Sequence, residues 1–119
     1  MANPFVHIEL QTQDPEKSKK FYTAMFDWKL EGIPAMEYTV IKVGEGTGGG
    51  MMKKPLPDMP DNWLPYILVD DVAASTKKAL TLGATICKDV TEVPDMGWFS
   101  VIADPTGAAF GLWQPRACK

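Results

Sequence analysis

Several short segments of the chain have the apolar composition of β-strands. Two other segments place apolar residues at the spacing of an α-helix. The extended segments are typical of β-strands, and they span residues 5–10, 28–30, 38–41, 50–52, 66–69, 84–87, 99–102 and 111–113. The helical spacing begins after Asp14 and again after Asp71. The pattern therefore predicts an α+β protein with two helices and short strands.

Each predicted helix begins at an aspartate that can cap it. The carboxylates of Asp14 and Asp71 can accept hydrogen bonds from the free N–H groups of the first turn, and Pro15 suits the first helical position. Gly83 predicts the end of the second helix. We expect the core to receive Phe21, Tyr22, Met25 and Phe26 from the first helix and Val72, Ala79, Leu80 and Leu82 from the second.

The chain contains an internal repeat. Segment 14–20 matches segment 71–77 at a constant spacing of 57 residues (71 − 14), and segment 38–52 matches 99–113 at a spacing of 61 (99 − 38). The longer match describes a strand, a turn and a strand in both copies. Each copy therefore has the order βαβββ, and the second copy has four more residues between its helix and its hairpin.

The length and composition suit one domain made of the two copies. A chain of 119 residues with 45% hydrophobic and 23% charged residues is long enough and apolar enough to bury a core. We expect a single domain over 1–119, with module one at about 4–52 and module two at about 63–115. Residues 53–62 hold three prolines, which predicts a semi-extended surface linker that could reach on the order of 30 Å.

The charge and cysteine content exclude several classes of partner. Twelve Lys and Arg against fifteen Asp and Glu give a formal charge of −3, so nothing favours nucleic acid or an anionic membrane. The sequence has no signal-peptide pattern and no apolar run of roughly 18–20 residues. Cys87 and Cys118 do not form a disulfide framework. We expect a cytoplasmic protein.

The order of several motifs resembles that of a known superfamily. The motifs are His7 in the first strand, Phe21-Tyr22 in an Asp-capped helix, Val69-Asp70-Asp71-Val72, and the closing run from Asp104-Pro105-Thr106-Gly107 to Phe110-Gly111-Leu112-Trp113. This order is similar to that of the glyoxalase/bleomycin-resistance/extradiol-dioxygenase, or vicinal oxygen chelate, superfamily. The resemblance implies two βαβββ modules that form a curved eight-stranded mixed sheet, a cup, with the helices on its convex face and ligands on its concave face.

The same resemblance implies which positions of this chain would hold a metal ion. Carrying the ligand positions of metal-using members onto this chain gives His7, Gly50, Leu64 and Gly111, of which only His7 can coordinate a metal. A catalytic zinc needs about three protein ligands, and His7 is the single histidine. We therefore expect no metal and no other cofactor. A divalent metal stays an alternative if other residues, or a second subunit, supply the missing ligands.

Strand alternation predicts which residues line the cup. If Val6, Ile8 and Leu10 pack under the helices, the side chains between them face the other way. With the repeat, the predicted ligand-binding residues are His7, Glu9, Gly50, Met52, Leu64, Tyr66, Gly111 and Trp113. The two glycines would let a planar ligand approach the backbone closely.

His7 and Glu9 are also the candidate catalytic pair. A nearby carboxylate raises the pKa of a histidine, which would suit acid–base work near neutral pH. A purely structural histidine and a solvated glutamate explain the same two residues.

Three functions stay open at the level of the sequence. The first is a metal-independent protein that binds a small organic molecule. The second is a metal-dependent lyase, isomerase or dioxygenase of the same fold that uses His7. The third is a structural or regulatory domain whose cup stays empty. We also expect a homodimer, because two such modules leave sheet edges and an apolar rim to cover.

Overall fold

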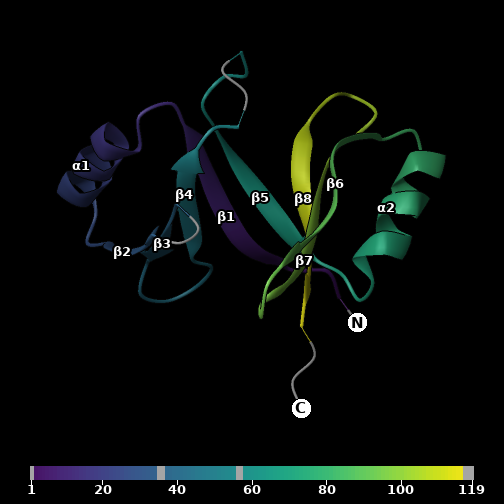
Figure 1. Ribbon diagram of the computed structural model, residues 1–119, viewed down its shortest axis with the longest axis horizontal. Coiled ribbons are helices and arrows are strands. Elements are labelled where there is room, and N and C mark those ends of the chain that lie inside the picture. The colour runs from purple at the N-terminus through teal and green to yellow at the C-terminus, as the bar shows by residue number, and fades with distance from the viewer. Residues whose placement is uncertain (1, 35–36, 56–57, 117–119) are drawn as a thin grey trace. The chain divides into compact units, whose positions relative to one another are not determined.

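The computed structural model describes residues 2–34, 37–55 and 58–116, and its ten elements follow the predicted order (Figure 1). The elements of the first copy are β1 (Phe5–Thr12), α1 (Pro15–Met25), β2 (Lys29–Ile33), β3 (Tyr38–Lys42) and β4 (Gly49–Lys53). Those of the second copy are β5 (Asn62–Leu68), α2 (Val72–Thr81), β6 (Thr85–Val93), β7 (Gly97–Ala103) and β8 (Ala109–Pro115). The predicted βαβββ order is confirmed in both copies.

The chain forms two compact units. His7–Leu64 make up what we call the first unit, and Met1–Val6 with Pro65–Lys119 make up the second unit. The boundary between them passes through β1 and β5. Each unit contains one helix and the hairpin strands of one sequence repeat.

The eight strands form a mixed sheet, in which some neighbours are parallel and others antiparallel. The order of neighbours is β2-β3-β4-β1-β5-β8-β7-β6. In the first unit β2, β3 and β4 are antiparallel neighbours, and β4 runs parallel to β1. In the second unit β6, β7 and β8 are antiparallel, and β8 runs parallel to β5. The predicted α+β class with an eight-stranded mixed sheet is confirmed.

The strand registers show that the sequence repeat is also a structural repeat. In the first unit Gly50 is the partner of Glu9 on β1 and of Val40 on β3. In the second unit, Gly111 has the equivalent partners, Tyr66 on β5 and Val101 on β7. Corresponding positions in the two hairpins therefore have equivalent neighbours.

The helix caps confirm the sequence prediction. The side chain of Asp14 accepts a hydrogen bond from the backbone N–H of Lys17 at 3.1 Å, and Asp71 accepts one from Ala74 at 3.1 Å. Gly83 has a φ of 98° just after α2, a conformation that glycine adopts without strain. The helix boundaries are thus fixed by contacts within a few residues.

Each unit has a separate small core. In the first unit Leu10, Ile41 and Met51 form it, and Tyr22 and Trp28 pack against it. In the second unit it consists of Val69, Val72, Ile102 and Leu112.

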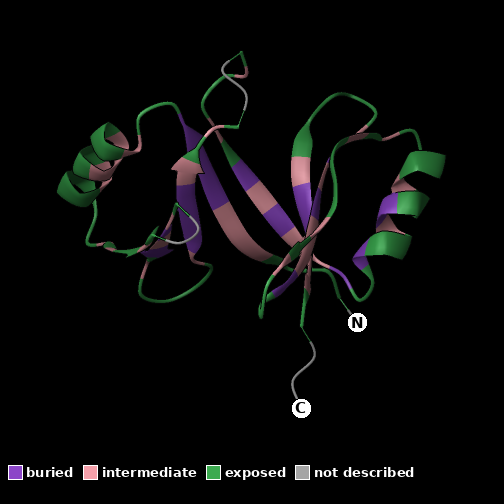
Figure 2. Ribbon diagram, viewed as in Figure 1, coloured by how far each residue is buried: buried purple, intermediate pink, exposed green. Residues whose placement is uncertain are grey.

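The expected helix contribution to the core is wrong in part. Of the residues expected there, five are exposed: Phe21 (56%), Met25 (58%), Phe26 (45%), Leu80 (47%) and Leu82 (67%). Helix α1 has no buried residue, whereas α2 buries Val72 and Thr76. Figure 2 shows the difference as purple bands on α2 that α1 lacks. The rings of Tyr22 and Trp28 stack at 5.6 Å and already cover the core beside α1, which leaves the neighbouring apolar side chains of that helix outside.

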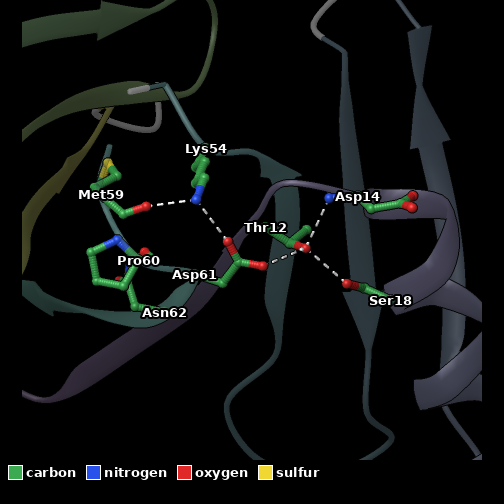
Figure 3. A network of polar contacts seen from close by, with 8 residues as sticks. All are labelled: Thr12, Asp14, Ser18, Lys54, Met59, Pro60, Asp61 and Asn62. Atoms are coloured by element: carbon green, nitrogen blue, oxygen red, sulfur yellow. Dashed lines mark hydrogen bonds and ion pairs between the residues drawn. The ribbon is translucent and has the colours of Figure 1, made fainter. Parts of the chain in front are cut away.

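Polar contacts join the two described ends of the segment between β4 and β5, which the sequence predicts to be a semi-extended surface linker. Lys54 Nζ lies 3.1 Å from Asp61 Oδ1 and donates to the carbonyl of Met59 at 2.6 Å (Figure 3). Thr12 donates to Asp61 at 3.3 Å, and its hydroxyl lies 2.9 Å from that of Ser18. The contact of Asp61 attaches the segment to β1, and the contact of Ser18 attaches α1 to the same threonine of β1.

The structure also bears on the cysteines and on membrane-spanning helices. Cys87 is exposed and free, while Cys118 lies outside the described residues. No helix within the described ranges is long and apolar enough to cross a lipid bilayer.

Candidate functional site

A chain of polar side chains lies on the face of the first unit opposite its core. Nε2 of His7 is 2.7 Å from the hydroxyl of Tyr38, and that hydroxyl donates to Oε1 of Glu9 at 3.1 Å. Gln11 donates to the other carboxylate oxygen of Glu9 at 2.9 Å. Because the tyrosine has one proton and gives it to Glu9, Nε2–H of His7 is the donor to the tyrosine oxygen. Tyr38 thus connects the histidine to the glutamate.

The protonation of His7 is set mainly by burial. Desolvation lowers the pKa of His7 below its ordinary value of 6.5, and the carboxylate of Glu9 opposes this without reversing it. The predicted effect of Glu9, which raises the pKa of His7, is present, but desolvation outweighs it and the net pKa is lowered. A neutral imidazole at neutral pH agrees with the donor role of Nε2–H toward Tyr38.

The ring of Tyr38 occupies the space above Gly50. A Cβ atom at Gly50 would collide with the hydroxyl oxygen and ring carbons of Tyr38. The ring therefore stands where a ligand would have to lie to reach the backbone at this glycine, and the assignment of Gly50 to the ligand site stays a prediction. Gly50 permits the contact between Tyr38 on β3 and the side chains of β1.

The second unit repeats this arrangement with apolar groups. The ring of Tyr66 covers Gly111, where a Cβ atom would collide with it. Tyr66 contacts Phe99 edge-to-face at 6.2 Å between ring centroids. By the repeat, Tyr66 corresponds to Glu9 and Phe99 corresponds to Tyr38. The same two positions thus hold a hydrogen-bonded pair in one unit and an aromatic pair in the other.

The predicted ligand-binding residues fall into two sets. The first unit holds His7, Glu9, Gly50, Met52 and Leu64, and the second unit holds Tyr66, Gly111 and Trp113. Glu9 and Leu64 are buried, and His7, Met52 and Trp113 are half-buried. The inference that both sets line one site stays a prediction.

A cavity of about 310 Å³ borders this polar chain at Tyr38. Met52 and Thr39 line it from the strands, and Pro15 and Lys19 line it from α1. Its volume is at the lower end of the range for small-molecule pockets. It combines apolar walls with a tyrosine, a threonine, a lysine and a glutamate, Glu37.

The residues at the family's metal positions do not fit a metal. Tyrosine rings cover Gly50 and Gly111, and Leu64 is a buried aliphatic side chain. Across the part of the chain that the structure describes, no three His, Cys, Asp or Glu side chains are grouped closely enough to hold a metal ion. His7 and Glu9 supply two donors, fewer than a stable site needs.

Comparison with known sequences identifies the superfamily. A family model described as "Bleomycin resistance protein-like N-terminal" matches residues 4–44. A Mycobacterium tuberculosis protein named "Putative glyoxylase CFP32" is 34% identical over 110 residues, which cover 90% of this chain and 42% of that protein. The chain belongs to the glyoxalase/bleomycin-resistance superfamily.

A less similar relative is the "Anthracycline biosynthesis protein DnrV" of Streptomyces peucetius, 27% identical over 124 residues. The match covers 90% of this chain and 45% of that protein. The chain therefore spans less than half the length of the curated relatives it matches.

Solved structures share the fold at low sequence identity. A hypothetical protein from Bacillus halodurans matches with a TM-score of 0.70 and 12% identity over 100% of this chain and 99% of that one. Methylmalonyl-CoA epimerase from Streptomyces coelicolor, solved with 2-nitronate-propionyl-CoA, matches with a TM-score of 0.67 and 14% identity over 95% and 97%.

Sequence reasoning missed two members of the polar chain. Nothing in the sequence marks Gln11 as a site residue, and Tyr38 falls within a predicted strand without a predicted role in the site. Gly50 is the feature of the sequence that could have indicated Tyr38, because a position without a side chain leaves room for a large residue from a neighbouring strand.

Proposed function

We propose that this chain is a metal-independent protein that binds a small organic molecule beside Tyr38 in the first unit. The observation that carries this proposal is the position of Tyr38, which fills the space over Gly50 and is hydrogen-bonded to both His7 and Glu9. A ligand in the adjoining cavity would meet Met52 and the tyrosine. A few fixed polar groups beside an apolar wall are the usual composition of such sites.

Isotope-edited NMR tests the proposal. The protein is titrated with single compounds from a set of small phenols, carboxylic acids and amides, and the backbone signals of residues 38, 39 and 52 report binding. We expect at least one compound to shift these signals saturably, and Tyr38→Phe to weaken that compound's binding. Tyr22→Phe is the matched control, since Tyr22 packs beside the core and not in this cavity. Shifts scattered over both units, or equal effects of the two substitutions, would refute the site.

A proton-transfer enzyme of the same fold is the second candidate, favoured by the direction of the hydrogen bonds. Tyr38 could accept a proton from a bound ligand as its own proton passes to Oε1 of Glu9. The ligand would lose one proton and Glu9 would gain it. Solvent deuterium exchange into a bound ligand, lost in Glu9→Gln, tests this step.

Homodimer formation and a cytoplasmic location are part of the proposal. Strands β2 and β6 are at the two ends of the strand order, and sheet edges favour pairing with another chain. The free, exposed Cys87 suits a reducing compartment. Light scattering that gives the mass of one chain, 13.1 kDa, at all concentrations would refute the dimer.

A further inference from the structure

A second cavity lies on the core side of the sheet in the first unit, across that sheet from the polar chain described above. It has a volume of about 230 Å³, and the residues that line it are Ile8, Trp28, Ile41, Val43, Thr47, Gly48, Gly49 and Trp63. Ile8 alternates with His7 and Glu9 along β1, so this cavity is separated from the polar chain by the sheet. We propose that it binds a neutral, planar aromatic molecule of one or two rings.

The two tryptophans provide the shape for an aromatic ligand. Their ring centroids are 6.4 Å apart, with an angle of 84° between the planes. The two indoles meet edge to face and form two perpendicular walls, so a ligand ring in the corner beside them could stack on one and meet the other edge to face, which are the two preferred aromatic geometries. Trp63 is 39% exposed, so a ligand would remove apolar surface from water.

The strand that forms the remaining wall is flat because it has no side chains there. A Cβ atom at Gly49 would collide with the backbone carbonyl of Ile8, and one at Gly48 would lie 3.0 Å from the carbonyl of Ile41. Close packing of the strands therefore requires glycine at Gly49 and leaves little room at Gly48. A flat, bare wall matches the face of a planar molecule.

The charge and size of the cavity restrict the ligand further. None of the described residues that line the cavity carries a charge, and a charged ligand would lose its hydration without gaining an ionic partner among them. The volume exceeds the roughly 150 Å³ of an apolar cavity that admits benzene, and it is below the roughly 300 Å³ at which drug-sized pockets begin. A neutral molecule of one or two rings meets both limits.

Fluorine NMR of 4-fluorotoluene is the test. We expect the ¹⁹F signal of this probe to shift and broaden saturably when the protein is added. Trp63→Leu should weaken binding roughly two- to tenfold, the range expected for an aromatic contact, and Val43→Phe should weaken it by filling the cavity. Trp98→Leu, which removes a tryptophan from the second unit, is the matched control. The charged probe 4-fluorobenzoate should bind at least tenfold more weakly.

Several outcomes would overturn the proposal. They are the absence of saturation up to the solubility of the probe, an equal loss of binding in Trp98→Leu, and equal binding of 4-fluorobenzoate. A dimer in light scattering that Trp63→Leu dissociates would show instead that a second copy covers this surface. Thermal unfolding of each variant checks that it is folded, and Tyr38→Phe should leave probe binding unchanged, which separates this cavity from the site proposed above.

Discussion

The hydroxyl of Tyr38 reaches Nε2 of His7 at 2.7 Å although their strands are not neighbours. Strand β4 lies between β3 and β1, and it places Gly50 where the tyrosine crosses. Any larger residue at that position would collide with the ring. The glycine thus makes possible the hydrogen bonds that join the two strands above β4.

Gly50→Ala should destabilise the protein. The added methyl group collides with Tyr38, and we expect a loss of about 1–3 kcal/mol in the free energy of unfolding, as for other overpacked sites. Gly32→Ala is the control, because a Cβ atom there meets nothing within 4 Å. Urea unfolding of both variants measures the difference. If Gly50→Ala is as stable as Gly32→Ala, the position of Tyr38 is wrong.

The stability of the protein should depend on the titration of His7. Burial lowers its pKa in the folded state below 6.5, so the unfolded state binds more protons between the two pKa values. Stability from the neutral imidazole is then complete above pH 6.5 and is lost as pH falls through 6.5 toward the folded pKa. Comparing urea unfolding of wild type and His7→Gln between about pH 5 and pH 8 isolates this effect.

An NMR titration of His7 tests the effect of Glu9 on its pKa. Glu9→Gln should lower the pKa of His7 further, because it removes the carboxylate that raises it. His7 is the only histidine, so its ring signals need no assignment. A pKa at or above 6.5 in the wild-type protein would contradict the burial described here.

Two methionines of the first unit should differ sharply in their effect on stability. Met51 is 1% exposed in the core, and Met51→Ala should cost about 2–5 kcal/mol of unfolding free energy. Met25 is 58% exposed on α1, and Met25→Ala should change stability by no more than about 0.5 kcal/mol. Similar losses in both variants would show that α1 packs more deeply than the structure indicates.

Lys54 should control the ionisation of Asp61. Its hydrogen bond is the largest cause that lowers the pKa of Asp61, so Lys54→Met should raise that pKa toward its ordinary value of 3.8. Lys53→Met, at the exposed neighbouring position, is the control. The stabilisation from Asp61 is present above its ordinary pKa and is lost as pH falls toward the folded value. Carboxyl NMR titrations of the three proteins measure the shift.

Metal ions should not change the thermal stability. Gly50, Leu64 and Gly111 offer no ligand, so adding zinc, manganese, nickel or magnesium should leave the melting temperature unchanged, and a chelator should do the same. A bound ion would stabilise the folded state by mass action. Elemental analysis that finds about one zinc per chain after dialysis would contradict this prediction and revive the metal-dependent alternative.

The sequence by itself predicted the features that depend on residues close together in the chain. Asp14 and Asp71 cap their helices through contacts three residues away, and such contacts recur wherever the same local sequence recurs. The repeat also predicted that Gly50 and Gly111 occupy equivalent hairpin positions. Their registers agree because a two-residue strand period fixes which residues face the core.

The candidate site and the exposed apolar surface were decided by tertiary structure. Tyr38 meets His7 and Glu9 only because β4 is inserted between β3 and β1, and alternation along one strand does not reveal which strands are neighbours. Phe26 has the residue type of a core position, but Tyr22 and Trp28 already cover the core beside α1. The pKa of His7 depends mainly on how far the surrounding residues exclude water from the imidazole. A local sequence pattern does not predict this desolvation. Strand order and solvent exclusion are properties of the whole packed unit, so only the folded chain sets them.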